Sequence, residues 1–181
     1  MPLAIVICGP AASGKSFLAA ELARRSALAL VSSDEVRRRL AKVPAGERGR
    51  PEHYRASLTR RTYGELAREA GQALDRGGGV IVDATCRSRA DRAPLLQGLR
   101  ATGSRCLAVR CEVPLELALE RARRRLGDPA RLSDATPQIA EEQFRAFEEI
   151  DELPAADVLR LETAQPLEDQ LAALALGVDA A

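Results

Sequence analysis

The sequence predicts an α/β protein in which a parallel sheet lies between two layers of helices. Short apolar runs alternate with longer segments of helical periodicity from one end of the chain to the other. A glycine-rich turn, GPAASGKS at 9–16, joins the first apolar run to the first helical segment. Strands that alternate with helices pair in parallel, and the crossover helices cover both faces of the sheet. The 181 residues are enough for one such domain with its own core.

Five segments are expected to form strands, because each is short, apolar and bounded by turn residues. They are Leu3–Cys8, Ala27–Val31, 80–83, 105–113 and 156–162. Helices are expected where apolar residues recur at helical spacing, and several of these segments begin at a capping residue or a proline. They are 16–26, 32–41, 54–74, 88–103, 114–127, 137–151 and a terminal helix from Pro166. Residues 43–52, rich in Pro, Gly and charge, are expected to form a loop.

Composition argues against several functional classes. The formal net charge of +1 does not suit a general nucleic-acid coat or a membrane-surface protein, which need a strong basic excess. One histidine and four cysteines without CxxC spacing argue against a zinc site. No stretch reaches the roughly 18 apolar residues of a membrane span, and nothing resembles a signal peptide. We therefore expect a reducing cytoplasm and no membrane partner.

The turn at 9–16 has the full pattern G-x-x-x-x-G-K-[ST] of a loop that binds nucleoside phosphates. Its glycines let successive N–H groups point at phosphate oxygens, and the following helix adds the positive end of its dipole. The ammonium group of Lys15 would contact the β- and γ-phosphates, and the hydroxyl of Ser16 would bind Mg²⁺. The pattern predicts ATP and Mg²⁺ as cofactors, with a preference for ATP over GTP left open. The residues expected to bind the nucleotide are Gly9, Ala12, Ser13, Gly14, Lys15, Ser16 and Phe17.

The strand VIVD at 80–83 ends in a carboxylate, as does the strand that supports Mg²⁺ in proteins with such a loop. Any buried strand can end in Asp, so the ending alone has little weight. Its occurrence together with the phosphate loop is what favours a metal role. Asp83 is therefore expected to hold Mg²⁺ together with Ser16, directly or through water.

Asp34 is the residue that best distinguishes a kinase, which transfers the phosphate to a hydroxyl group, from an ATPase, which transfers it to water. It follows the second expected strand, at the edge where open α/β sheets bind ligands. A carboxylate there can orient a hydroxyl group and accept its proton as the hydroxyl attacks the γ-phosphate. The alternative is that Asp34 caps the following helix, although Ser32 or Ser33 can do so instead. Glu35 is the second candidate for the base.

Arginines cluster in the segment 121–134, on a helix that leads into a charged turn. Such a segment can close over a nucleotide as a lid and stabilise the transferring phosphoryl group. Arg121 and Arg125 share one helix face and are the expected nucleotide contacts, and Arg125 is also expected to be catalytic. Arg124 can replace either of them. The alternative is a solvated basic face without a ligand.

These stretches together resemble the small P-loop kinases, near the 5′-polynucleotide kinase and zeta-toxin groups. They also resemble the kinase-like domains that some bacteria fuse to an aminoglycoside-phosphotransferase-like domain. The resemblance is carried, within residues 3–134, by IVICGPAASGKSFLAAELA, VSSDEVRRRL, VIVDATCRSRADR and LERARRRLGD. It implies the three-layer P-loop NTPase fold, with five parallel strands in the order 2-3-1-4-5.

The resemblance also implies roles for single residues. Asp34 takes the place of the catalytic base, and Arg37, three residues later, that of an arginine that contacts the substrate. Thr85 follows Asp83 in the pattern D-x-[TN]. The resulting expectations are Asp34, Arg37, Thr85 and Arg87 for the substrate, Arg121 and Arg125 for the phosphates, and Lys15, Asp34 and Arg125 for catalysis. The loop reads GPAASGKS where many relatives have GPPGSGKS, which leaves phosphate binding intact.

The sequence thus predicts a single kinase domain over 1–181, with a lid around 121–134, that transfers the γ-phosphate of ATP to a hydroxyl group. The near-neutral charge favours a small-molecule acceptor such as a sugar, nucleoside or antibiotic. The closest motif match favours the 5′-hydroxyl of a nucleic acid instead. A nucleotide-binding module that hydrolyses ATP slowly and regulates a partner is the alternative from another class.

Overall fold

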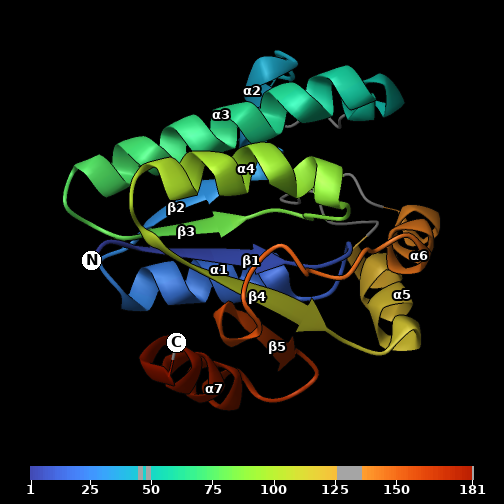
Figure 1. Cartoon of the computed structure of the whole chain (residues 1–181). Helices are drawn as coiled ribbons and strands as arrows, with labels where there is room; N and C mark the ends of the chain where they lie inside the picture. The colour runs from blue at the N-terminus through green and yellow to red at the C-terminus, as the bar shows by residue number, and fades with distance from the viewer. Residues whose placement is uncertain (45–46, 48–49, 126–135, 181) are drawn as a thin grey trace.

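Five parallel strands form one sheet in the order β2-β3-β1-β4-β5, which confirms the predicted topology. The computed structural model describes residues 1–44, 47, 50–125 and 136–180. The strands are β1 (Leu3–Cys8), β2 (Ala29–Ser32), β3 (Val80–Asp83), β4 (Arg105–Glu112) and β5 (Val158–Glu162). All of them run in the same direction, so their carboxyl ends meet at one edge of the sheet (Figure 1).

Helices cover both faces of this sheet, as Figure 1 shows. They are α1 (Lys15–Arg25), α2 (Ser33–Leu40), α3 (Ala56–Asp75), α4 (Arg89–Ala101), α5 (Leu115–Arg124), α6 (Pro137–Arg145) and α7 (Leu167–Ala180). Helices α3 and α4 lie on one face, and α1 and α7 lie on the other. Helices α5 and α6 lie beyond the carboxyl ends of the strands.

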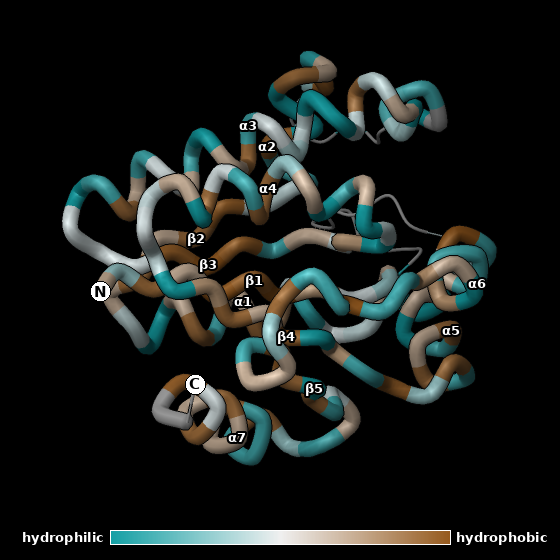
Figure 2. Tube along the Cα trace, viewed as in Figure 1, coloured by the Kyte–Doolittle hydropathy of each residue, from teal (hydrophilic) through white to brown (hydrophobic). Residues whose placement is uncertain are grey.

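Two apolar cores attach these helices to the sheet. In one, residues of α3 and α4 such as Leu66 and Leu95 pack on β1 and β3. In the other, Leu18 of α1 and Leu174 of α7 pack on the opposite face of β1 and β4. Figure 2 shows the result, with hydrophobic strands at the centre and hydrophilic segments on the outer sides of the helices. The alternation of strands and helices therefore predicted the layers correctly, because the central strands β1, β3 and β4 are buried on both faces.

The register of the central strands brings three chain segments together. Ile7 of β1 lies beside Asp83 of β3, and Ser32 of β2 lies on the other side of Asp83. The pairing continues past the strand, since the backbone N–H of Ala84 donates to the carbonyl of Ile7 at 3.2 Å. The loops that follow β1, β2 and β3 are therefore neighbours at the carboxyl edge of the sheet.

The prediction of one helix over 137–151 was wrong at its end, because α6 stops at Arg145. Beyond it, backbone groups of Glu148, Glu149 and Glu152 bond to α4 and to the segment before α4. The N–H of Glu148 donates to the carbonyl of Arg87 at 2.8 Å, and the guanidinium of Arg92 donates to the carbonyl of Glu149 at 2.7 Å. These long-range hydrogen bonds replace the helical ones that the amphipathic pattern predicts.

Within the described ranges, none of the helices combines the length and the hydropathy that crossing a bilayer requires.

Candidate active site

The loop at 9–16 connects β1 to α1 and is anchored at both ends. At its start, the N–H of Gly9 donates to the carbonyl of Thr85 at 3.2 Å. In its middle, the N–H of Ser13 donates to the carbonyl of Pro10 at 3.2 Å, and the ammonium group of Lys15 lies 3.5 Å from the same carbonyl. Helix α1 begins at Lys15, so its unpaired N-terminal N–H groups face the loop. This is the geometry by which a helix start binds an anion.

The backbone of this loop takes left-handed conformations at Ala12, with φ 62°, and at Gly14, with φ 93°. A Cβ atom on Gly14 would lie 3.1 Å from the side chain of Thr163, so this position requires glycine for space as well as for conformation. Ala12 has a Cβ and adopts the left-handed region at a cost of about 1–2 kcal/mol. It is the position at which related loops have the glycine of GPPGSGKS.

Two residues that the sequence did not single out hold the loop from other elements. The hydroxyl of Thr163, directly after β5, donates to the carbonyl of Ser13. The side-chain carbonyl of Gln143, on α6, accepts from the N–H of Ala11 at 2.8 Å. In the sequence, only the position of Thr163 directly after an expected strand could have indicated a role at the carboxyl edge of the sheet. No local sequence pattern indicated a role for Gln143.

Phe17 and Ser16 are exposed on the first turn of α1, whereas Ser13 is completely buried. The Ser13 hydroxyl has no hydrogen-bond partner among the described residues. A Cβ atom on Gly9 would lie 2.5 Å from this hydroxyl oxygen, so the close approach of Ser13 requires glycine there. The seven residues expected to bind the nucleotide thus form one continuous loop and helix start.

Asp83 ends β3 beside β1 and is 7% exposed. Its Oδ1 atom has no hydrogen-bond partner among the described residues. A buried carboxylate oxygen without a partner is costly, and a cation or a cation-bound water supplies what is missing. The unpartnered oxygen of Asp83 is therefore compatible with a cation site, and the expected second ligand, Ser16, is exposed at the start of α1.

A cavity of about 510 Å³ adjoins the phosphate loop at the carboxyl edge of the sheet. Two of its lining residues, Thr85 and Gln143, are the ones that hydrogen-bond Gly9 and Ala11 of the loop. All four of the residues predicted to bind the substrate line it. The complete lining is Ser33, Asp34, Arg37, Arg50, Tyr54, Thr59, Tyr63, Thr85, Arg87, Asp91, Thr136, Ile139, Glu142 and Gln143.

Asp34 lies in the first turn of α2 rather than at its cap. The helix begins at Ser33, and Ser32 occupies the cap position without a side-chain hydrogen bond. Asp34 lines the cavity, whereas its neighbour Glu35 is exposed and does not. The geometry therefore favours Asp34 over Glu35 as the carboxylate that faces a bound acceptor.

Arg37 is buried one helical turn after Asp34. Its Nη1 atom donates to the carbonyl of His53 at 2.9 Å and to the hydroxyl of Thr59 at 3.3 Å. Its guanidinium lies over the ring of Tyr54, 4.9 Å from the centroid. Arg87, in contrast, is an exposed residue at the rim of the same cavity.

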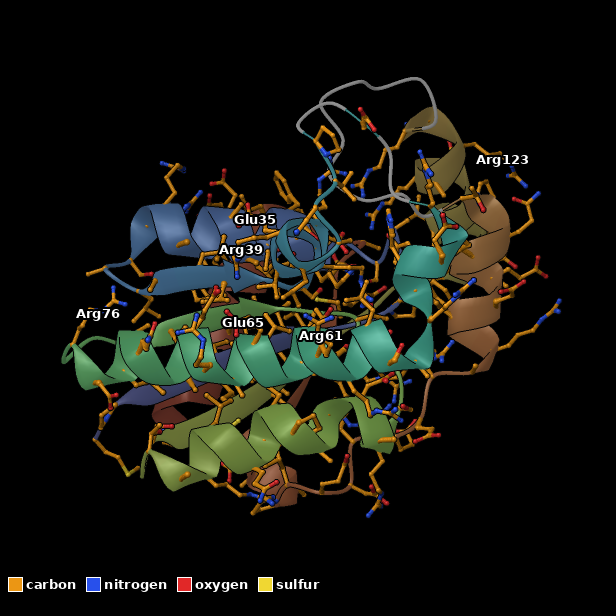
Figure 3. All side chains as sticks on the ribbon, turned by 90° about the horizontal axis from the view of Figure 1, so that it is seen from above. Glu35, Arg39, Arg61, Glu65, Arg76 and Arg123 are labelled. Carbon is orange, nitrogen blue, oxygen red and sulfur yellow. The ribbon has the colours of Figure 1, made fainter. Side chains whose placement is uncertain are left out.

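Arg121, one of the expected lid arginines, contacts the segment that holds the loop. Its guanidinium donates to the carbonyl of Thr163 at 2.9 Å. Burial, and to a smaller extent the charge of Arg125, lowers the pKa of Arg121. Arg124 instead pairs with Glu120 on the solvent side of α5, and Figure 3 shows Arg123 on the outer side as well. Residues 126–134 of the expected lid lie outside the described residues.

The cysteines near the site are structural. All four are buried and unpaired thiols. Burial raises the pKa of Cys111, at the end of β4, to about 12, so this thiol is protonated at neutral pH. A hydrogen bond with Cys86 and burial raise the pKa of Cys8 as well. The thiols beneath the loop therefore act as small apolar side chains.

Comparison with known proteins places this geometry in a family. A family model described as an AAA domain (AAA_33) matches residues 5–150. A search among curated proteins returned no match.

Solved structures of similar fold include several kinases. A sugar kinase from Janibacter sp. HTCC2649 is 20% identical, with a TM-score of 0.73 over 100% of this chain and 96% of that one. The APS kinase CysC of Mycobacterium tuberculosis, in complex with AMPPNP and APS, is 19% identical, with a TM-score of 0.72 over 98% of both chains. A kinase-like protein from Chloroflexus aurantiacus is 18% identical, with a TM-score of 0.75 over 98% of this chain and 96% of that one. What these proteins share with this chain is the fold.

Proposed function

The chain belongs to the AAA_33 family of AAA domains, and we propose that it is an ATP-dependent kinase that transfers the γ-phosphate to a hydroxyl group. One observation carries the proposal. The Asp34 carboxylate lines a cavity of about 510 Å³ that adjoins the phosphate loop through Thr85 and Gln143. A volume of this size suits a small-molecule acceptor rather than a water molecule alone.

The reaction follows from what each residue can do. The loop N–H groups and Lys15 would bind the β- and γ-phosphates and hold the γ-phosphorus toward the cavity. Asp34 would accept the proton of the acceptor hydroxyl. The oxygen of that hydroxyl would form the new bond to phosphorus. The bond between that phosphorus and the bridging oxygen breaks, and ADP leaves. Arg121 and Arg125 would balance the negative charge of the phosphate oxygens.

Ser16 and Asp83 would hold the Mg²⁺ ion. A bound Mg²⁺ neutralises charge on the phosphate oxygens and fixes their orientation. The buried Oδ1 atom of Asp83, which lacks a partner among the described residues, supports this assignment.

The net charge of the chain and its structural neighbours support a small-molecule acceptor. A net charge of +1 suits a small molecule better than a nucleic acid. A sugar kinase, a gluconokinase and an APS kinase have the same fold, and one of them was solved with the ATP analogue AMPPNP. We therefore place ATP and a small hydroxyl compound in this site, within one kinase domain over 1–181 that works in a reducing cytoplasm.

The test compares Asp34→Asn with Glu35→Gln in an assay of label transfer from γ-labelled ATP to pooled metabolites. We expect Asp34→Asn to reduce transfer about 10²- to 10⁴-fold, because it removes the general base, and to leave ATP affinity unchanged. Glu35→Gln, an exposed change of the same kind on the next residue, should transfer label like the wild type. Lys15→Ala should lose about 10²-fold or more, because charge on the phosphates is lost in the transition state.

Equal turnover of ATP without an acceptor, in the wild type and in Asp34→Asn, would contradict the kinase assignment. That outcome would favour the nucleotide-binding regulatory module instead.

A further inference from the structure

Tyr63, on α3, is a buried tyrosine whose hydroxyl group accepts a hydrogen bond but does not donate one within the described residues. The side chain belongs to a residue that is only 3% exposed. Its oxygen accepts from the backbone N–H of Cys86 at 2.8 Å. A hydroxyl group both donates and accepts, and a buried donor without an acceptor is unfavourable. The environment of Tyr63 therefore lacks one hydrogen-bond acceptor.

The phenol of Tyr63 keeps its proton at neutral pH. Burial is the main reason that its pKa lies well above the ordinary value, and the charge of nearby Asp91 raises the pKa further. The hydrogen bond from Cys86 acts in the opposite direction and does not outweigh burial. Tyr63 is therefore a neutral donor, and the group that completes its hydrogen bonding is one with a lone pair.

The hydroxyl of Tyr63 reaches the wall of the acceptor cavity. Tyr63 lines this cavity, and so does Thr85, directly before the residue that Tyr63 binds. Asp34 and Thr85 each follow by two residues a paired position of neighbouring strands, since Ser32 of β2 lies beside Asp83 of β3. Neighbouring strands are about 4.8 Å apart. The candidate base and the Tyr63 hydroxyl therefore face one small cavity from adjacent loops.

The loop that Tyr63 contacts is held in an uncommon conformation. Cys86 has φ 52°, in the left-handed region that residues with a side chain seldom adopt. Its N–H is bound by Tyr63, and its carbonyl accepts from the guanidinium of Arg92 at 2.9 Å. These two hydrogen bonds fix the loop and the phenol relative to each other. The donor is thus oriented before a ligand arrives, which lowers the entropic cost of binding.

We propose that the hydroxyl of Tyr63 donates a hydrogen bond to a second oxygen atom of the acceptor and so selects polyhydroxylated compounds over simple alcohols. The proposal rests on the proposed function and deepens it. Asp34 faces the hydroxyl that receives the phosphate, and Tyr63 faces the second oxygen, so both oxygens belong to one small molecule. Tyr63 takes part in no covalent step and is a specificity-determining residue.

Other hydroxyl groups in the cavity agree with this assignment. Besides Tyr63, the hydroxyl residues of the lining are Ser33, Thr59, Thr85 and Thr136. Thr59 and Thr136 use their hydroxyls within the protein, to accept from Arg37 and from a backbone N–H of α6. The side chains of Ser33 and Thr85 form no hydrogen bond with the described residues. Such groups both donate and accept, as the hydroxyls of a polyol do.

The first experiment compares acceptors that differ by one oxygen. γ-Labelled ATP is offered with a pool of alditols, aldoses and inositols, and separately with a pool of monohydric alcohols. We expect transfer to a member of the first pool, and each monodeoxy analogue of that member is then assayed. One analogue should have a kcat/KM about 10- to 100-fold lower, because it leaves the proton of Tyr63 without an acceptor.

Tyr63→Phe shows whether the missing oxygen is the one that Tyr63 contacts. The variant keeps the ring in the core and removes the hydroxyl. It should lower kcat/KM about 10- to 100-fold for the polyol and much less for the deoxy analogue. The discrimination between the two acceptors should then fall to about threefold or less. A variant that only disturbed the loop would lower kcat/KM by the same factor for both acceptors.

The matched control is Cys86→Gly, which changes the same loop and leaves the Tyr63 hydroxyl in place. Glycine adopts a φ of 52° without strain and keeps the N–H that Tyr63 accepts. This variant should discriminate between the polyol and its deoxy analogue like the wild type. In the double variant Tyr63→Phe/Cys86→Gly, the loop no longer needs the phenol to hold a strained residue, and the discrimination should be lost as in Tyr63→Phe.

Three outcomes of these assays would overturn the proposal. The first is equal kcat/KM for the polyol and all of its monodeoxy analogues in the wild type. The second is wild-type discrimination in both variants that carry Tyr63→Phe. The third is transfer to monohydric alcohols alone. Each of them would leave the kinase assignment intact.

The kinase assignment fails separately, in the comparison of Asp34→Asn with Glu35→Gln. Binding still tests Tyr63 in that case. The protein is saturated with AMPPNP and Mg²⁺ and is titrated calorimetrically with the alditols, aldoses and inositols of the pool and with their monodeoxy analogues. We expect at least one of them to bind the wild type about tenfold or more tightly than it binds Tyr63→Phe. Equal affinity for the two proteins, or no binding by any of these compounds, would overturn the assignment of Tyr63.

Discussion

Gln143 is a single residue that joins the phosphate loop to the acceptor cavity. Its side-chain carbonyl accepts from the N–H of Ala11 at 2.8 Å, and the same side chain lines the cavity. The amide nitrogen of the side chain is a donor, which suits a position beside a phosphate. Gln143 therefore links the loop expected to bind the phosphates to the cavity proposed to bind the acceptor.

Gln143→Glu is expected to raise the Kd for ATP roughly tenfold, because it puts a negative charge near the triphosphate. The new carboxylate can still accept from the N–H of Ala11, so the loop should keep its shape. Gln97→Glu, the same change at an exposed site on α4, should leave the affinity unchanged. Binding of labelled ATP measures both variants, and equal affinity in the two would contradict this role for Gln143.

At the scale of elements, helices α3 and α4 approach each other closely where Gly98 faces Ala67. A Cβ atom on Gly98 would lie 2.7 Å from the Cβ atom of Ala67, closer than two carbon atoms can pack. The glycine is thus required by the distance between two helices and not by backbone conformation. Gly64, on α3, has open space around it and offers the matched comparison.

Gly98→Ala is expected to lower the free energy of unfolding by about 1–3 kcal/mol, because the helices must move apart. Gly64→Ala should instead raise it by about 0.5–1 kcal/mol, because alanine favours the helix more than glycine does. Urea unfolding followed by circular dichroism measures both. Equal shifts of the same sign would rule out the packing argument.

The segment 146–152, between two elements, is held in place by an arginine of α4. It connects α6 to the strand β5 and is bound along α4 by Arg92, which donates to the carbonyls of Cys86, Glu148 and Glu149. Arg92 thereby ties the segment that follows α6 to the loop that follows β3. We infer that Arg92 is a positioning residue for α6, and so for Gln143.

For the molecule as a whole, the Arg92–Glu152 pair makes stability depend on pH. Burial raises the pKa of Glu152, but hydrogen bonds from Arg92 and its charge outweigh burial, and the net pKa lies below the usual value. Because the pKa is lower in the folded than in the unfolded state, the stabilisation is fully present above about pH 4.5 and is lost as the pH falls through the folded value.

Glu152→Gln is therefore expected to lower the free energy of unfolding by about 3 kcal/mol at pH 7, because it leaves Arg92 buried without its counter-ion. The loss of stability between pH 5 and pH 3 should become smaller in this variant. Glu116→Gln, at an exposed site on α5, serves as the control and should follow the wild type at each pH. Urea unfolding measures the free energy of unfolding of both variants across this pH range. The same dependence on pH in Glu152→Gln and Glu116→Gln would contradict the role of the pair.

Much of this architecture could be predicted because it depends on local patterns. Strand β1 was predicted at its observed bounds, and the sheet order was predicted from the resemblance to P-loop kinases. The loop at 9–16 and Asp34 were identified from their positions after apolar strands. In a parallel sheet, residues that follow strands must gather at one edge, so periodicity alone brings them together.

The remaining features were decided by contacts between residues far apart in the chain. Thr163 and Gln143 are more than a hundred positions from the loop that they hold. The end of α6 at Arg145 depends on hydrogen bonds to α4. By itself the sequence determined the layers, the phosphate loop and the candidate base, because each follows from the spacing of nearby residues. Only the tertiary structure decided which buried charges have partners, because the partner of a charge is set by packing and not by position in the chain.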